Sequence, residues 1–260
     1  RDFCLSRGLG DVYKRQLPSN LTEIGYNAFE GTTALTTITI PKTVTTAGNN
    51  VFNGSALKTA AIENGATAVA DNLFSNAKNL TKVTIPNTVK KVGSMSFYGC
   101  KSLSSVTLPN TLTEIGYSAF NGTTALTTIT IPKTVTKAGS DVFEDSGLKT
   151  AIIENGATSV PNNLFSKATN LTQITIPNTV KKIGSMSFYD CTKLSSVTLP
   201  NTLTSIETSA FKNCQAMKSI TIPKSVTYFG TTAVGYSCLL YTSSEPTRQA
   251  EISYAVFCLK

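Results

Sequence analysis

The feature that most constrains this chain is a phenylalanine that returns at steps of 22 or 23 residues. Nine phenylalanines follow this spacing and a valine takes the tenth place: Phe29, Phe52, Phe74, Phe97, Phe120, Phe143, Phe165, Phe188, Phe211 and Val234. The apolar residues of one repeat follow no single period, so one copy cannot bury them by itself. The sequence therefore predicts a single repeat solenoid, with about nine to ten rungs of 22–23 residues that cover one another.

Each repeat begins with a short run that has the pattern of a strand. In the copy at residues 79–100, Leu80, Val83 and Ile85 lie on an extended run that Pro86 ends. Proline is tolerated there because the strand has no further ladder bond to donate. Since each rung copies the last in the same sense, we expect neighbouring strands to pair in parallel.

Parallel stacking also predicts two outward columns along the solenoid, because alternate residues of a strand point to opposite faces. One column contains Thr39, Ala61, Thr84, Thr107, Thr130, Ile152, Thr175, Thr198 and Thr221. We expect hydroxyls in these columns to bond to one another across strands. The columns also resemble an ice-binding face, but Ala61, Ile152, Lys82 and Gln173 interrupt the threonines and disfavour that reading.

The return path of each repeat contains a glycine and then the repeating phenylalanine. We expect this glycine, as in Gly93, to adopt a turn that a Cβ would strain. The short segment around Phe97 is predicted to form a helical turn. Two repeats replace the proline with Glu-Asn-Gly at residues 63–65 and 154–156, which predicts tight turns there.

A longer period of 91 residues lies over the short one. Residues 17–107 and 108–198 form two modules, and residues 199–237 are a partial third module. The two full modules differ at 22 of their 91 positions, mostly in polar or small residues. The modules are therefore predicted to share one core and to differ on their surface.

The two ends of the chain, residues 1–16 and 238–260, do not follow the repeat. They hold all four arginines and three of the six cysteines. A DNA sequence that encodes residues 11–16 has a reverse complement that encodes residues 238–243 in another frame. We therefore expect both ends to be translated sequencing adapters, and the gene to be cut short on both sides; genuine tails are the alternative.

The repeat resembles the BspA-type leucine-rich repeat, which also occurs in Treponema surface proteins. Residues 108–129 and 199–220 carry the pattern most fully, although Glu207 replaces the turn glycine and Met217 the strand leucine. The resemblance covers residues 17–237. It implies a right-handed leucine-rich repeat solenoid of short parallel β-strands with helical turns. It also implies an extracellular or cell-surface protein of adhesion type, with no shared catalytic residues.

Composition narrows the function further. Residues 17–237 have 17 lysines and 11 acidic residues, a net charge of +6, and no arginine, so bidentate contacts to phosphate or guanine are absent and no nucleic-acid partner is expected. No apolar run is long enough to predict a membrane span. The chain has no histidine, no nucleophile elbow and no phosphate-binding glycine loop, so we expect no enzyme activity, no metal and no cofactor.

The sequence therefore favours a protein that binds a macromolecule, either a protein or a glycan, through its surface. The candidate contacts are Thr84, Thr107, Thr130, Thr175, Thr198, Tyr98, Tyr117, Tyr189, Lys90, Lys91, Lys181 and Lys182. A solvated face is the favoured alternative for the lysines, and the cover of rung edges is the favoured alternative for the tyrosines. A passive spacer in a larger surface protein, or a non-catalytic part of a multidomain enzyme, remains an alternative.

Three cysteines lie within the repeats, each three residues after the repeating phenylalanine: Cys100, Cys191 and Cys214. Other repeats carry threonine, serine or alanine at this place, which predicts a small buried side chain. Cys191 and Cys214 lie on adjacent rungs, at a spacing that also permits a disulfide.

Overall fold

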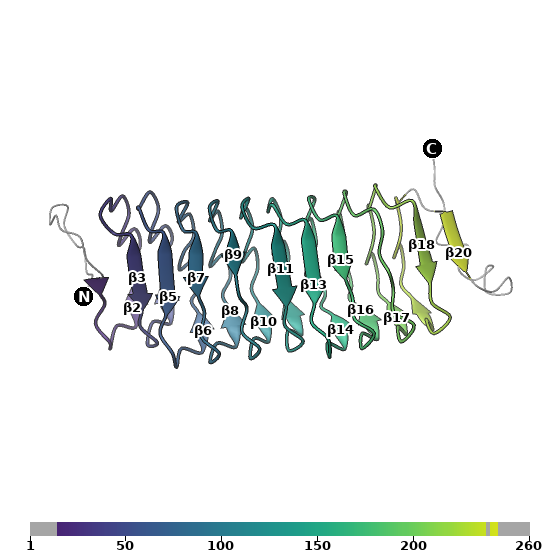
Figure 1. Ribbon diagram of the computed structural model, residues 1–260, viewed down its shortest axis with the longest axis horizontal. Helices are drawn as coiled ribbons and strands as arrows, with labels where there is room; N and C mark the ends of the chain where they lie inside the picture. The colour runs from purple at the N-terminus through teal and green to yellow at the C-terminus, as the bar shows by residue number, and fades with distance from the viewer. Residues whose placement is uncertain (1–14, 238–239, 244–260) are drawn as a thin grey trace.

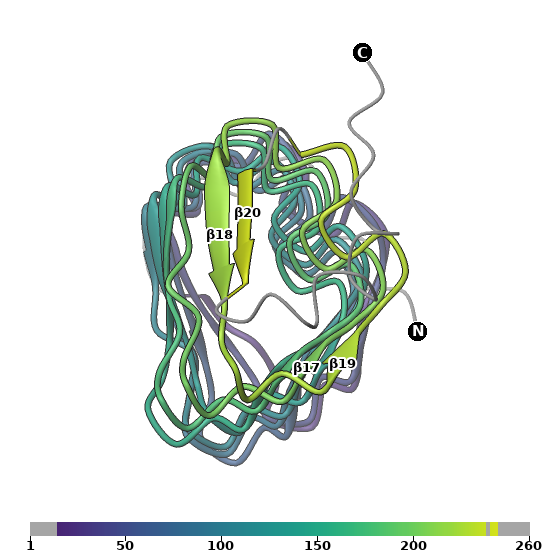
Figure 2. The same cartoon turned by 90° about the vertical axis from the view of Figure 1, so that its right-hand side faces the viewer.

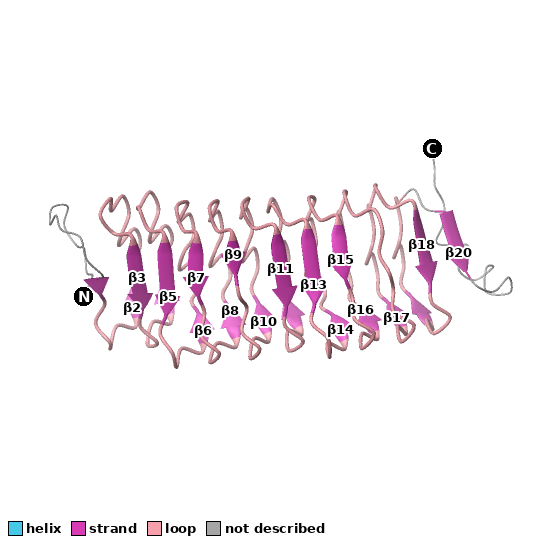
Figure 3. Cartoon of the chain, in the orientation of Figure 1, coloured by secondary structure: helices cyan, strands magenta, loops and turns pink. Residues whose placement is uncertain are grey.

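A computed structural model describes residues 15–237 and 240–243. The described chain winds into an elongated solenoid whose rungs lie one behind another along the long axis (Figure 1). Within these residues there are strands and turns but no helix (Figure 3). The predicted β-solenoid is confirmed, and the expected helical turns are wrong.

Two sets of strands run along the solenoid. The front face consists of β1 (Arg15–Gln16), β3 (Thr37–Ile40), β5 (Thr59–Ile62), β7 (Lys82–Thr84), β9 (Ser105–Val106), β11 (Thr128–Ile131), β13 (Thr150–Ile153), β15 (Gln173–Thr175), β18 (Ser219–Ile222) and β20 (Leu240–Ser243). The rear face consists of β2 (Glu23–Ile24), β4 (Thr46–Ala47), β6 (Ala68–Val69), β8 (Lys91–Val92), β10 (Glu114–Ile115), β12 (Lys137–Ala138), β14 (Ser159–Val160), β16 (Lys182–Ile183), β17 (Ser205–Ile206) and β19 (Tyr228–Phe229). Seen along the axis, these faces form two sides of the cross-section, and the loops around the phenylalanines close the third (Figure 2).

Every strand pair in the described part of the chain is parallel, as the copied rungs predict. Residues one rung apart are partners, for example Thr128 with Thr150 and Ile129 with Ala151. The ladders are not continuous, however. The front face parts between β9 and β11 and again after β15, and the rear face parts between β4 and β6 and between β12 and β14.

The core is a column of stacked phenylalanine rings. Successive rings from Phe29 to Phe211 lie 5.0–5.7 Å apart between centroids and within 20° of parallel. Inward residues of both faces, such as Ile129 and Val92, pack around this column and are buried. Full burial of one such side chain contributes about 1.5–3 kcal/mol, which offsets part of the ordering entropy of its rung.

The segment around each phenylalanine is a pair of turns rather than a helical turn. Met95, Phe97 and Gly99 each donate a backbone N–H to the next rung at 2.8–2.9 Å. Met95 and Gly99 have positive φ angles of 53° and 65°. A helix would direct these N–H groups back along its own chain, so the demand for pairing between rungs excludes it here.

The return-path glycines also have a different role from the predicted one. A Cβ on Gly116 would lie 2.5 Å from the backbone nitrogen of Ser94 on the preceding rung, and Gly139 is packed in the same way. Neither glycine has a positive φ angle. Close approach between rungs, and not turn conformation, therefore excludes a side chain at these positions.

Two parts of the chain ends join the strand ladders. Arg15–Gln16 forms β1 beside β3, and Leu240–Ser243 forms β20 beside β18. The rest of both predicted adapter segments lies outside the described residues. The assignment of residues 1–16 and 238–260 to adapters, and of residues 17–237 to the repeat domain, stays a prediction.

Candidate functional site

The front face presents a row of exposed hydroxyl groups. Strand β11 alternates exposed and buried residues, which directs Ile129 and Ile131 into the core and leaves Thr130 in solvent. The five predicted contact threonines, Thr84, Thr107, Thr130, Thr175 and Thr198, are all exposed. The prediction that these threonines point outward is confirmed. They lie on successive or nearby rungs.

The expected bonds between outward threonines are wrong for this row. Other threonines bond between rungs, and they donate to backbone carbonyls: Thr88 to Ala66 and Thr111 to Val89, both at 2.7 Å. Among the described residues, no side-chain hydrogen bond involves Thr84, Thr107 or Thr130. These hydroxyls are therefore free to donate to and accept from a partner.

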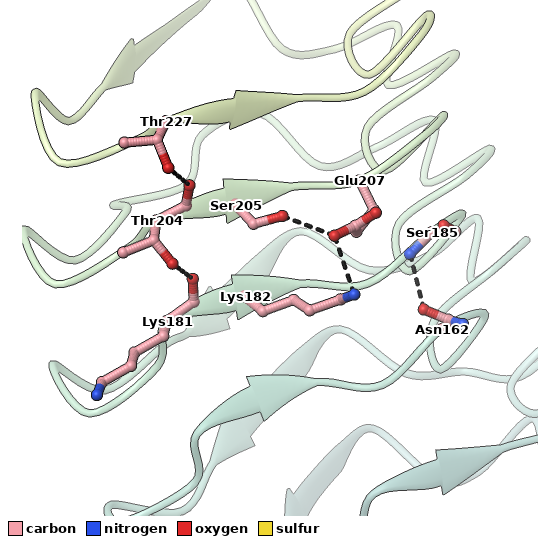
Figure 4. Close-up of polar contacts among 8 residues, drawn as sticks. All are labelled: Asn162, Lys181, Lys182, Ser185, Thr204, Ser205, Glu207 and Thr227. Carbon is pink, nitrogen blue, oxygen red and sulfur yellow. Dashed lines mark hydrogen bonds and ion pairs between the residues drawn. The ribbon is translucent and has the colours of Figure 1, made fainter.

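The four candidate lysines lie on the rear face or at its edge. Lys91 is on β8 and its Nζ is 3.1 Å from Oε1 of Glu114. Lys182 is on β16 and its Nζ is 2.9 Å from Oε1 of Glu207 (Figure 4). Lys90 and Lys181 are exposed beside them. Half of the predicted basic row is thus already paired with carboxylates.

Glu207 shows how a departure from the repeat is accommodated. It stands where most rungs have glycine, and it accepts a hydrogen bond from Oγ of Ser205 at 2.6 Å. This hydrogen bond, together with Lys182, lowers the pKa of Glu207. The carboxylate is therefore the stable form, and it keeps Lys182 engaged across the rungs.

The candidate tyrosines lie on the loops near the phenylalanines. Tyr117 is 50% exposed and suits a contact, whereas Tyr98 and Tyr189 are only partly exposed. Nζ of Lys212 lies 5.8 Å from the ring centre of Tyr189 and 5.3 Å from that of Tyr236. Sequence reasoning missed this cation–π group, because Lys212 and Tyr236 hold places that other rungs fill with unrelated residues.

The predicted contact residues do not converge on one site. The threonines occupy the front face, the lysines the rear face, and the tyrosines the connecting loops. A partner large enough to touch all three would have to wrap around the solenoid. The front face alone carries candidate residues of one kind on several rungs, with Ile152 standing between Thr130 and Thr175.

The three repeat cysteines are free and buried. Each thiol donates to the carbonyl of the phenylalanine on the preceding rung, as Cys100 does to Phe74 at 3.0 Å. Burial raises the pKa of Cys100 and Cys191 well above the usual range, and that of Cys214 to about 12. The thiols therefore pack as small neutral groups, as predicted, and the alternative of a bridge between Cys191 and Cys214 is not what the structure contains.

The described residues contain no cluster of three or more histidine, cysteine, aspartate or glutamate side chains placed to hold a metal ion. In the same part of the chain there is no helix long and apolar enough to cross a bilayer.

Comparison with known proteins agrees with this repeat geometry. The model of the BspA type leucine rich repeat region matches residues 9–92, 67–191 and 158–259. A search of curated proteins found no match. Among solved structures, a leucine-rich repeat protein from Eubacterium ventriosum is 32% identical, with a TM-score of 0.62 over 90% of this chain and 66% of the other. One from Bacteroides ovatus is 25% identical, with a TM-score of 0.62 over 88% of this chain and 71% of the other.

Proposed function

Because the chain belongs to the family of BspA-type leucine-rich repeat proteins, we propose that it is a non-catalytic protein that binds a macromolecule, either a protein or a glycan, at the cell surface or outside the cell. The family supplies a repeat scaffold of the kind that serves interaction. The chain spans 66% of the length of the first solved relative. What a whole protein of that length does is therefore also a proposal.

The observation that carries the proposal is the row of exposed, unbonded threonine hydroxyls on the front face. Hydroxyls both donate and accept hydrogen bonds, so this row suits a polar partner with groups of both kinds. The repeated spacing allows several weak contacts to act together along one partner.

The sequence differences between the two modules also support binding through the surface. Only three of the 22 exchanges occur where both modules bury the residue: Val83/Ile174, Val92/Ile183 and Ala70/Pro161. Each of the other exchanges changes a residue that is exposed or partly exposed in at least one of the two modules, and the apolar core is kept. A scaffold that changes its surface and keeps its core is suited to recognition.

The test is biolayer interferometry of the full chain against matrix proteins, mucin-type glycans and heparin. The double variant Thr107→Glu/Thr130→Glu should weaken binding at least about tenfold, because it places two charges in the hydroxyl row. The matched control Asn87→Glu/Asn178→Glu changes two exposed turn residues and should bind as the native chain does. Binding to none of these partners, by a folded chain, would leave a passive spacer as the better function.

A further inference from the structure

The strand ladder of the rear face is interrupted in the middle of the second module. Its ladder stops at β12 and resumes at β14, and no backbone hydrogen bond joins these two strands, both of which are fully described. Where the ladder is intact, the return-path residue donates to the preceding rung, as Gly139 does to Ile115 at 2.8 Å. Pro161 occupies the equivalent place after β14 and has no N–H to donate.

Small side chains accompany this opening in both modules. Ala138 on β12, and Ala47 on β4 in the first module, stand where the other rungs place a larger apolar residue, and both are partly exposed. The first module parts there as well, although Ala70 keeps the N–H that Pro161 lacks. The shared alanine is therefore the better account of the opening, and Pro161 adds to it in the second module.

The opening in the second module is a cleft of about 450 Å³. The polar residues that line it are Thr136, Lys137, Ser159, Asn162 and Lys182. The carbonyls of Thr136 and Ala138 accept no backbone hydrogen bond from the next rung, within the described chain, because the ladder is open. The cleft thus offers acceptors from the backbone and donors from the side chains.

The first module provides a natural comparison, because the equivalent lining residues there are different. Thr46 stands in place of Lys137, Ala68 in place of Ser159, and Asp71 in place of Asn162. At these positions the first module has Lys91 and Asp71, with a net charge of zero. The second module has Lys137 and Lys182, with a net charge of +2.

The exchange of Asp71 for Asn162 removes a negative charge but keeps a hydrogen bond between rungs. Asp71 accepts a hydrogen bond from the N–H of Ser94 at 2.8 Å, and Asn162 accepts one from Ser185 at 2.9 Å (Figure 4). The bond between rungs is kept, the negative charge is removed, and the amide NH₂ of Asn162 is left to donate. A purely structural role does not require this change.

Ion pairs with neighbouring carboxylates leave one lysine of the cleft without an acidic partner in the described part of the chain. Lys182 is paired with Glu207, and Glu114, which is the strand partner of Lys137, has its Oε1 3.1 Å from Lys91. Lys137 itself is exposed and has no ion pair in the described part of the chain. It is the free cation of the cleft.

We propose that the cleft between β12 and β14 binds an acidic sugar unit, whose carboxylate or sulfate group is held by Lys137, Ser159 and Asn162. Sugar hydroxyls supply the donors that the open carbonyls of Thr136 and Ala138 accept. The volume lies within the range of small-ligand sites, about 300–1,000 Å³. An acidic peptide has the same negative charge as an acidic sugar but fewer hydrogen-bond donors. The site is on the rear face, so it does not depend on the binding proposed for the front face.

The test is an NMR titration of the full chain with glucuronate, with N-acetylglucosamine 6-sulfate and with neutral glucose. We expect shifts at the Asn162 side-chain amide and at Ser159 with one acidic sugar, and much smaller shifts with glucose. The more tightly bound acidic sugar identifies the anionic group. Lys137→Thr, which restores the residue of the first module, should weaken binding about five- to tenfold, because one charge-assisted hydrogen bond is lost.

A gain of function makes the proposal sharper. The triple variant Thr46→Lys/Ala68→Ser/Asp71→Asn should create a second site and raise the stoichiometry from one to two. Lys149→Thr, at an exposed lysine outside the cleft, is the matched control and should leave binding unchanged. Absence of shifts at the cleft, an equal loss in the control, or tighter binding of a glutamate tetrapeptide would overturn the proposal.

Discussion

At the scale of single residues, the phenylalanine column decides the fold. The rings from Phe52 to Phe211 are fully buried, and each ring from Phe52 to Phe188 stacks on the ring above and the ring below. Offset stacking adds about 0.5–1.5 kcal/mol per aromatic pair beyond area burial. A middle ring takes part in two such pairs, so its loss affects three rungs.

Phe97→Ala should therefore destabilise the chain by about 3–5 kcal/mol, because it leaves a cavity between Phe74 and Phe120. Thr107→Ala, in the exposed row, should cost less than about 1 kcal/mol. Urea unfolding followed by circular dichroism measures both. Similar losses at the two positions would contradict the assignment of inward and outward residues.

The buried thiols predict a loss of stability at alkaline pH. Their pKa is raised in the folded chain, so the contribution of the neutral thiols is fully present below the unfolded pKa of about 8.5. Above it, the unfolded chain releases protons that the folded chain retains. Each thiol then reduces the free energy of unfolding by about 1.4 kcal/mol per pH unit, up to its folded pKa.

The triple variant Cys100→Ala/Cys191→Ala/Cys214→Ala tests this, because Ala77 and Ala168 already occupy the equivalent place in other rungs. Its free energy of unfolding should fall less between pH 8 and pH 10 than that of the native chain. The two proteins differ only at the three cysteines, so the difference between the two curves isolates the thiols. Parallel curves would show that the thiols are not buried in the neutral form.

At the scale of elements, the sequence predicts the strands well and the turns poorly. Alternation between Pro132 and the preceding leucine identifies β11 and its buried side, and the Glu-Asn-Gly turn closes as expected, with Ala66 N–H donating to Glu63 at 3.2 Å. The spacing of three residues in the phenylalanine segment suits a helical turn as well as the pair of turns that forms there, so spacing alone does not distinguish the two. The signal that distinguishes them is Asn, Asp or Gly two residues after the phenylalanine, as in Gly99 and Asp190, where φ is positive.

Met186 is a position where this turn is under strain. Its φ angle is 54°, a region that costs an ordinary residue about 1–2 kcal/mol, and its side chain is 43% exposed. Asn163 holds the equivalent place on the preceding rung with a φ angle of 59°. Met186→Asn should therefore raise the free energy of unfolding by about 0.5–1 kcal/mol, since asparagine tolerates this region and little apolar burial is lost.

Thermal unfolding monitored by calorimetry measures this gain. Met186→Ala is the control, because alanine removes the same side chain without tolerating the left-handed region any better. A gain of equal size in both variants would attribute the effect to the exposed side chain and not to the backbone.

At the scale of the whole molecule, interactions connect neighbouring rungs. Side-chain hydrogen bonds between rungs join residues 21 to 26 apart in the sequence, as Lys42 with Glu63 and Cys100 with Phe74. The candidate residues on each face could be named from the sequence, because strand alternation gives the side on which a residue lies. The cleft at Lys137 could not, because it depends on where the ladder parts, which is decided by how neighbouring rungs pack and not by the residues of one rung.

Nearest-neighbour contact predicts that a whole module can be removed in register. Excision of residues 108–198 joins Thr107 to Leu199, which is the equivalent of Leu108 one module later, and it removes 91 of the 221 residues in the range 17–237. The shortened chain should fold, and its urea m-value should fall by about 40%, in proportion to the surface buried. Excision of residues 108–186 is the control: it joins Thr107 to Ser187 in the middle of a phenylalanine segment, so strand and turn no longer alternate. This second chain should lose cooperative unfolding, because the rungs on either side of the junction can no longer present matching ladders. If both chains unfolded with the same midpoint and the same m-value, register between rungs would not be what holds the solenoid together.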